Sequence, residues 1–426
     1  MRNTTDGGDA ILHGFRSLGI DYVMASPGSE WGPFWEAMAQ QQLSNEPGPT
    51  YLTCAHETLA VDLAIGYTSV TGRMQAVMLH TGVGLLQGSL GIEGALRGAI
   101  PMLILSGESV SFGDDPDVDP GFQWQAILNQ VGSPTRLIEP LVKWAHQTGS
   151  ISTMYQQIVS AGEMAQRTPR APTYLSVPIE VMMQPWSPPE ELRSAPPAPT
   201  TTATASDISD VCEMLLAAEN PAIITEESGR TPEGYAALVE LAELLSIPVI
   251  EGRFAPYANF PKDHPLWLGA GRPPLVDESD LILMIASRQP WYPLANTPKK
   301  ARIITIDDTP FRDHVVYQPS SAERFLEGDV AANLSLLIEA LKTGTIDSDA
   351  VSKRRAHWEA AGATRAAEKN AALDDARARD TIAPALLAAT LSELAPAGTI
   401  FVDETITHRP AIIGHLKTDG PTSYFR

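Results

Sequence analysis

One carboxylate stands out because of where it lies in the sequence. Glu57 opens the run HETLAVDLAIGYTSVTG (56–72), in which small and apolar residues predict a buried helix. An acidic residue in the first helical turn complements the helix dipole, which is the purely structural explanation. Packed against Leu59, Ala60 and Leu63, however, the carboxyl group would be poorly solvated and able to hold and share a proton. Glu57 is therefore a candidate for proton transfer.

A glycine-rich turn is the second candidate. HTGVGLLQG (80–88) is predicted to pass from a strand through a Gly-x-Gly turn into a helix, which could hold an anion or approach a flat ring closely. The turn lacks the third glycine of a dinucleotide fingerprint and the lysine of a P-loop, so a purely structural tight turn is the alternative. GAGRPP (269–274) is weaker, because two prolines stand where a helix would begin.

Other chemistries have little support. The nine histidines are scattered, without an HExxH pattern, so no metal ligands are predicted. The acidic stretch DDPDVDPG (114–121) is interpreted as a solvated loop, because Pro116 and Pro120 break a calcium-loop pattern. No GxSxG motif indicates a serine hydrolase. Cys54 and Cys212 lie far apart, which favours buried free thiols and a reducing compartment.

Composition restricts the classes of partner. The chain has 426 residues, 43% of them hydrophobic and 19% charged, which is typical of a globular protein. Its net charge of −21 argues against nucleic acid and anionic membranes as partners, because both need basic patches. No signal peptide and no membrane-spanning apolar run is recognisable, so a cytoplasmic location is expected.

Strand-like and helix-like segments alternate, which predicts an α/β protein of doubly wound parallel-sheet domains. The first predicted domain covers 1–185, and a linker rich in Pro, Ala and Thr follows at 186–205. A second α/β domain covers 206–345. A charged helical connector at 346–376 leads to a short unit, 377–426, which is too small to bury a core of its own.

Many modest motifs, taken in order, resemble the thiamine diphosphate enzymes of the acetolactate synthase, benzoylformate decarboxylase and 2-hydroxyacyl-CoA lyase group. GIDYVMASPG, the glutamate segment and the glycine turn match the family's first domain, with Val83 where the family has proline. LAELLSIPVIE, FPKDHPLWLG and IITIDDTP resemble its central domain. GTIFVDETITHR resembles the first strand and turn of its diphosphate-binding domain. The resemblance covers nearly the whole chain.

The resemblance implies a pyrimidine-binding domain, a central domain and the beginning of a diphosphate-binding domain, in that order. It also implies that Glu57 hydrogen-bonds the aminopyrimidine of thiamine diphosphate and thereby promotes the C2 ylide that attacks a carbonyl. The implied cofactor-binding residues are Pro27, Gly28, Glu57, Gly82, Gly84, Gln87, Glu404, Thr405, Thr407 and His408. The candidate substrate residues are Ser29, His80, Gln123 and Trp124. For His80, proton transfer and a structural role are both open.

The diphosphate half departs from the family pattern. The family binds Mg²⁺ and the diphosphate with a Gly-Asp-Gly segment followed by an Asn, and the sequence contains no Gly-Asp-Gly. We therefore expect a second subunit to carry this site, with two such heterodimers associating, because family active sites lie between domains of different protomers. We also expect residues 380–426 to expose apolar surface. A truncated single-chain enzyme and a non-catalytic scaffold are the alternatives.

The reaction implied by the resemblance is that of a C–C lyase or carboligase acting on a small 2-oxo or 2-hydroxyacyl compound, with 2-oxo acid decarboxylation as the near alternative. The segment TEES (225–228) stands where FAD- or ADP-binding relatives tend to have glycines, so FAD is not expected. A nicotinamide or flavin oxidoreductase would need a GxGxxG entry to a helix, which the sequence lacks.

Overall fold

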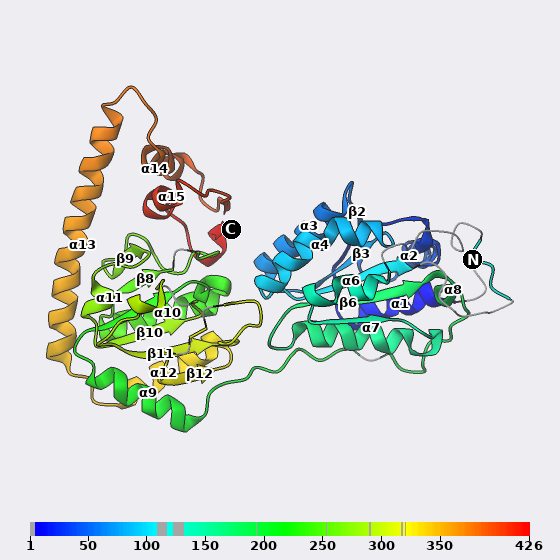
Figure 1. Ribbon diagram of the computed structural model, residues 1–426, viewed down its shortest axis with the longest axis horizontal. Coiled ribbons are helices and arrows are strands. Elements are labelled where there is room, and N and C mark those ends of the chain that lie inside the picture. Colours follow the sequence, from blue (N-terminus) through cyan, green and yellow to red (C-terminus); the bar gives the residue numbers. More distant parts are fainter. Residues whose placement is uncertain are drawn as a thin grey trace. The chain divides into compact units, whose positions relative to one another are not determined.

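The computed structural model describes residues 5–108, 117–121, 132–192, 194–252, 254–288, 291–316, 318–319 and 321–426. The chain forms two compact units, Met1–Pro199 and Thr200–Arg426 (Figure 1). Each unit is built on one six-stranded sheet in which every strand pairing is parallel, and helices cover the sheets. The predicted α/β class is thus confirmed. Among the described residues, no helix combines the length and the apolar character needed to cross a membrane.

The sheet of the first unit has the order β2-β1-β3-β4-β6-β5. In that order its strands are Thr50–Thr53, Tyr22–Ser26, Gln75–Leu79, Met102–Glu108, Pro172–Pro178 and Trp144–Gln147. The central strands β3, β4 and β6 are buried along their whole length, as expected for a parallel sheet covered on both faces.

Two hydrophobic cores lie on the two faces of this sheet. The helices of one core are α1 (Gly7–Ser17), α2 (Gly32–Ser44), α7 (Ile151–Gln166) and the short α8 (Ile179–Met182). The helices of the other core are α3 (Glu57–Thr71), α4 (Val83–Arg97) and α6 (Pro134–Ile138). Two 3₁₀ turns, η1 (Ser29–Trp31) and η2 (Glu139–Leu141), complete the unit.

Local signals explain where these helices begin and end. Asp6 caps α1 and forms a capping box with Asp9. His56 caps α3 through its side chain, and α3 ends at Gly72, whose φ of 70° is left-handed. In the described part of 187–204, within the predicted linker, the chain forms neither helix nor strand.

The sheet of the second unit has the order β12-β11-β10-β7-β8-β9. In that order its strands are Arg324–Glu327, Arg302–Asp307, Leu281–Ile285, Pro221–Thr225, Val249–Glu251 and Trp267–Ala270. One face is covered by α9 (Ala205–Ala217), α10 (Pro232–Leu245) and α12 (Val330–Thr343), and the other by α11 (Leu275–Glu278) and the buried Trp291. The short turns are η3 (Ser228–Arg230) and η4 (Leu294–Asn296).

A 30-residue helix, α13 (Ser348–Arg377), follows this sheet (Figure 1). Asp347 caps it, and only Leu373 and Ala376 are buried along it. Beyond it lie α14 (Pro384–Leu394), α15 (Arg409–His415), η5 (Pro421–Ser423) and the two-residue strands β13 (Phe401–Val402) and β14 (Tyr424–Phe425). The expected apolar surface of this segment is confirmed. Its exposed residues are Ile382, Leu387, Leu391, Leu394, Ile400, Val402 and Ile406.

Candidate active site

Three neighbouring strands bring most of the predicted site residues of the first unit to one edge. The turn after β1 carries Pro27, Gly28 and Ser29, and the turn after β3 carries His80. These strands pair in register, and the His80 N–H donates to the Ser26 carbonyl at 3.1 Å. Strand β2 pairs with the other side of β1 and leads into Glu57. Carboxyl ends of parallel strands meet at one edge, where ligands of α/β folds usually bind.

Glu57 is the first residue of α3, and its side chain is half-buried. The His56 side chain accepts from the Thr58 N–H at 3.1 Å, which fixes this first turn. Thr58 donates its hydroxyl to the Gln87 carbonyl at 3.0 Å and so ties α3 to α4. Within the described residues no cation lies at ion-pair distance from Glu57, which leaves the carboxylate available to a ligand.

Gly84 permits the close approach of α4 to this carboxylate. A Cβ at Gly84 would lie 3.2 Å from Oε1 of Glu57 and 2.8 Å from Cβ of His80. Gly82, the residue before α4, has a φ of 43°, a conformation that favours glycine. Gln87 lies one turn further along α4 and is exposed. The glycine turn therefore places backbone, rather than side chains, beside Glu57.

Part of the expected apolar surround of Glu57 is not formed. Ala60 is buried, but Leu59 and Leu63 are 45% and 38% exposed. The reason is the packing of α3, which turns Ala60, Val61 and Ala64 toward the sheet and the two leucines outward. The expectation that both leucines desolvate Glu57 is thus wrong for this unit by itself, and they add to an exposed apolar face instead.

His80 is held by a carboxylate that the sequence did not suggest. Glu30 is completely buried, and its Oε1 accepts from Nδ1 of His80 at 2.8 Å and from the Thr81 N–H at 2.9 Å. A Cβ at Gly28 would lie 2.0 Å from that Nδ1, so only glycine fits there. The pKa of His80 is raised, because its hydrogen bond to Glu30 outweighs burial and the charges of Glu30 and Glu57 add to it.

Of the other predicted substrate residues, only Ser29 lies among the described residues. Ser29 begins η1 and is exposed. Gln123 and Trp124 lie outside the described residues. The structure therefore brings Glu57, His80 and the glycine turns together.

The predicted diphosphate-side residues belong to the second unit, in the turn after β13. Glu404, Thr407 and His408 are exposed, and Thr405 is half-buried. The buried Asp403 organises this turn by accepting from the Thr405 N–H at 2.7 Å.

Two further residues, neither of which was predicted from the sequence, hold Asp403 in place. The Tyr424 hydroxyl donates to Asp403 at 2.6 Å, and Arg409 lies 3.4 Å from the same carboxylate oxygen. Burial alone would raise the pKa of Asp403, but the hydrogen bonds from Thr405 and Tyr424 outweigh it and lower that pKa.

The residues present fit one half of the cofactor that the sequence implies. A half-buried carboxylate without a cation partner, next to bare glycine backbone, suits a flat ring that presents a nitrogen. The Mg²⁺-binding half of the site differs from this pyrimidine half. Among the described residues no group of three or more His, Cys, Asp or Glu side chains could hold a metal ion.

Two models of one protein family match this chain. Residues 5–123 match the family model described as "Thiamine pyrophosphate enzyme, N-terminal TPP binding domain", and residues 208–337 match "Thiamine pyrophosphate enzyme, central domain". Benzoylformate decarboxylase from Pseudomonas aeruginosa is 26% identical over 96% of this chain and 73% of its own length. The acetolactate synthase large subunit from Haemophilus influenzae is 25% identical over 71% of this chain and 53% of its own length.

A solved structure shows the same fold. The thiamine diphosphate-dependent 4-hydroxybenzoylformate decarboxylase of Rhodococcus jostii RHA1 superposes with a TM-score of 0.77 and 21% identity, over 99% of this chain and 75% of that chain. The two family models together match more than half of the 426 residues, in the order that the family requires. The chain belongs to the thiamine pyrophosphate enzyme family.

Proposed function

We propose that this chain provides the pyrimidine-activating half of a thiamine diphosphate-dependent enzyme that forms or breaks a C–C bond next to the carbonyl of a 2-oxo or 2-hydroxyacyl compound. The observation that carries the proposal is the position of Glu57. Its carboxylate lies at the carboxyl edge of a parallel sheet, beside the glycine backbone of Gly84 and without a cation partner among the described residues.

Thiamine diphosphate, when bound, supplies a carbon nucleophile and an electron sink for C–C chemistry. Glu57 holds and shares a proton at the ring nitrogen of the aminopyrimidine, which is general acid–base work at a fixed position. The first turn of α3, capped by His56, orients the carboxylate. Gly84 keeps the ring's place free of side-chain atoms.

His80 is the second proton-handling group in this proposal. Its Nδ1 is held by Glu30, so Nε2 is the nitrogen left to exchange a proton with a substrate. Glu30 acts as a positioning residue, because it fixes the ring and favours its protonated form.

Decarboxylation of a 2-oxo acid is the second candidate reaction. Its support is the match to benzoylformate decarboxylase, which extends over 96% of this chain, whereas the match to acetolactate synthase extends over 71%. The two reactions share the initial attack on a carbonyl carbon, so the same roles of Glu57 and His80 serve both.

We further propose that the diphosphate and Mg²⁺ are held by a second polypeptide with a Gly-Asp-Gly…Asn segment, and that two such heterodimers associate. Two observations support a partner. The 426 residues contain no Gly-Asp-Gly, and the segment 380–426 exposes seven large apolar side chains. Glu404–His408 would line the diphosphate pocket from this chain's side.

Native mass spectrometry of the protein purified from its own cells tests this proposal. We expect a complex of this chain with a polypeptide carrying Gly-Asp-Gly…Asn, thiamine diphosphate and Mg²⁺, and the complex should turn over a 2-oxo acid. The same site found on a longer form of this chain would overturn the two-chain part only. A cofactor-free protein that stays inactive with added thiamine diphosphate and Mg²⁺ would overturn the catalytic assignment.

A further inference from the structure

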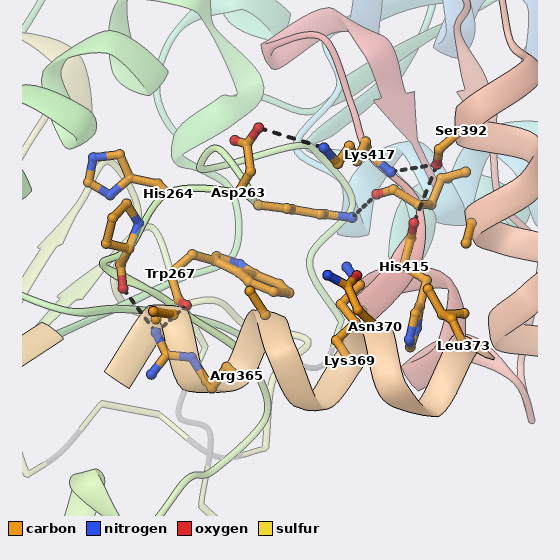
Figure 2. A pocket seen from close by; sticks show the side chains of 18 of the residues that line it. Asp263, His264, Trp267, Arg365, Lys369, Asn370, Leu373, Ser392, His415 and Lys417 are labelled. Atoms are coloured by element: carbon orange, nitrogen blue, oxygen red, sulfur yellow. Dashed lines mark hydrogen bonds and ion pairs between the residues drawn. The ribbon is translucent and has the colours of Figure 1, made fainter. Parts of the chain in front are cut away.

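The second unit contains a cavity of about 810 Å³ that the proposed chemistry does not use (Figure 2). Four parts of the chain enclose it: the segment 262–268 that leads into the edge strand β9, the second half of α13, one side of α14, and the segment 414–417 at the end of α15. The cavity lies beyond the edge of the sheet rather than at the carboxyl ends of its strands. It is thus separate from the place where α/β folds usually bind ligands.

Three cations face this cavity without a carboxylate partner. Lys262 donates to the Leu416 carbonyl at 3.1 Å, and Arg365 donates to the Pro265 carbonyl at 2.9 Å. Lys369 has no hydrogen bond or ion pair among the described residues. Figure 2 shows Lys369 rising from α13 into the cavity. In a chain with a net charge of −21, three cations gathered without counter-ions are unexpected.

These cations repel one another. The pKa of Lys369 is lowered by burial and by the charge of Lys417, against the opposing effect of Asp263. The pKa of Lys262 is lowered by burial, and the charge of Lys369 lowers it further against the opposing effect of Glu251. Charges that are partly removed from water and not paired are costly, so a bound anion would stabilise this arrangement.

The acidic residues that line the cavity form no ion pair with the three cations among the described residues. Asp263 faces Lys417 at 3.9 Å, and Glu393 accepts from Arg377 at 3.1 Å. Glu359 is exposed and lies ten residues before Lys369 on α13, which is about 15 Å along the helix axis. Among the described residues no carboxylate lies at ion-pair distance from Lys262, Arg365 or Lys369, although the charges of Glu251 and Asp403 act on Lys262 and that of Asp263 acts on Lys369.

One wall of the cavity is flat and apolar. The Trp267 indole lines it and donates to Glu251 at 3.0 Å, which fixes the ring. Leu373 and His415 line the side nearer α14 (Figure 2). We propose that this cavity binds an organic phosphate of nucleotide size, with the phosphates at Lys369, Lys262 and Arg365 and the ring against Trp267. Its volume suits a small ligand of this class, which inorganic phosphate alone would not fill.

Isothermal titration calorimetry with ADP tests the inference, on the protein in the assembly in which it is purified. Saturating thiamine diphosphate keeps ADP out of the cofactor site. We expect binding with a Kd below about 1 mM that weakens as salt is raised. Lys369→Gln removes a charged donor that supports nothing else, so it should weaken ADP binding about tenfold. Lys300→Gln, an exposed lysine of the same unit outside the cavity, is the matched control and should change nothing.

Three results would overturn the inference. ADP could fail to bind the wild-type protein, or it could bind Lys369→Gln and wild type equally well. Pyrophosphate that binds as tightly as ADP would remove the role of the Trp267 wall. None of these results depends on turnover, so they are separable from a failure of the proposed catalytic function.

Discussion

The carboxyl edges of the two parallel sheets differ in whether their charged side chains are paired. In the first unit, Glu57 lies half-buried with no cation at ion-pair distance among the described residues, and bare glycine backbone approaches it. In the second unit, the corresponding edge is occupied by side chains that pair with one another. The same architecture thus offers a ligand an open edge in one unit and a filled one in the other.

The filled edge is an ionic network after β7 and β11. Glu227 and Asp307 are buried there, and Arg312 lies 3.4 Å from the first and 3.7 Å from the second. Arg230 forms a further ion pair with Glu227. Glu226, also buried, accepts from the Arg288 N–H at 2.9 Å.

The carboxyl edge at which α/β folds usually bind ligands can thus be filled by the protein's own side chains. Glu226 and Glu227 stand in the segment TEES, where the sequence argued against a flavin. In the structure both carboxylates pair with arginines at this edge.

The largest effect is expected at the open edge. Glu57→Gln keeps the shape but removes the shared proton, so it should lower kcat on the order of 10³-fold. The melting temperature should stay unchanged, because no partner of the carboxylate is lost. Steady-state kinetics and thermal unfolding, with Glu93→Gln on α4 as control, measure both. Near wild-type turnover in Glu57→Gln would remove the proposed role.

The next effect is expected at the filled edge. Arg312→Met leaves Glu227 and Asp307 buried without that cation, so the second unit should lose roughly 3–5 kcal/mol of unfolding free energy. Urea unfolding measures the loss.

Two comparisons show whether this loss reflects buried charge. Burial raises the pKa of Asp307 to about 6, against the lowering effect of Arg312. Adding Asp307→Asn to Arg312→Met should therefore restore part of the stability. Arg324→Met breaks an exposed pair with Asp210 and should cost at most about 1 kcal/mol. Equal losses in Arg312→Met and Arg324→Met would contradict the contrast between the edges.

A smaller, pH-dependent effect is expected at the buried pair beside the open edge. Glu30 raises the pKa of His80 above its ordinary value of 6.5, so the pair stabilises the fold below pH 6.5. This stability is lost as pH rises through the higher pKa of the folded state. Glu30→Gln should therefore cost more at pH values well below 6.5 than at values well above it. NMR titration should show a lower His80 pKa in the variant, and an unchanged pKa would exclude Glu30 as the positioning residue.

The smallest effect concerns the turn at the open edge. Val83 is the first residue of α4, a position where proline is favoured, and the family turn has proline there. Val83→Pro should stabilise the first unit by about 0.4–1 kcal/mol through the unfolded chain, with turnover unchanged. Thermal unfolding measures the shift, and Val83→Ala is the control. A loss of stability would show that the turn is shaped differently from the family's.

The fold was largely predictable because its strands are continuous apolar runs and its helices begin and end at clear signals. The predicted glutamate helix starts at Glu57 and ends before Gly72, within the run 56–72 in which a helix was expected. The faces of that helix were harder to predict. Small residues occur all round it, so periodicity did not show that Leu59 and Leu63 face outward.

The site residues that form local sequence motifs could be predicted, whereas contacts between residues far apart in the sequence could not. Glu57 and Gly84 were both found from local motifs, and parallel strands bring them together. The Glu30–His80 bond joins residues 50 positions apart. This bond depends on the pairing of β1 with β3. A single acidic residue after a Pro-Gly turn does not by itself indicate a site residue. The support of Asp403 by Tyr424 was missed for the same reason.

The two glycines that flank His80 also limit how this edge can evolve. A Cβ at Gly28 would lie 2.0 Å from Nδ1 of His80, and one at Gly84 would lie 2.8 Å from its Cβ. Every nucleotide change that replaces glycine by another residue adds at least that one atom, so only synonymous changes leave these contacts undisturbed. At Gly28 the same Cβ would also lie 2.2 Å from Oε2 of Glu30, so loss of the histidine alone would not free this position. In a saturation-mutagenesis map, both positions should tolerate synonymous changes alone.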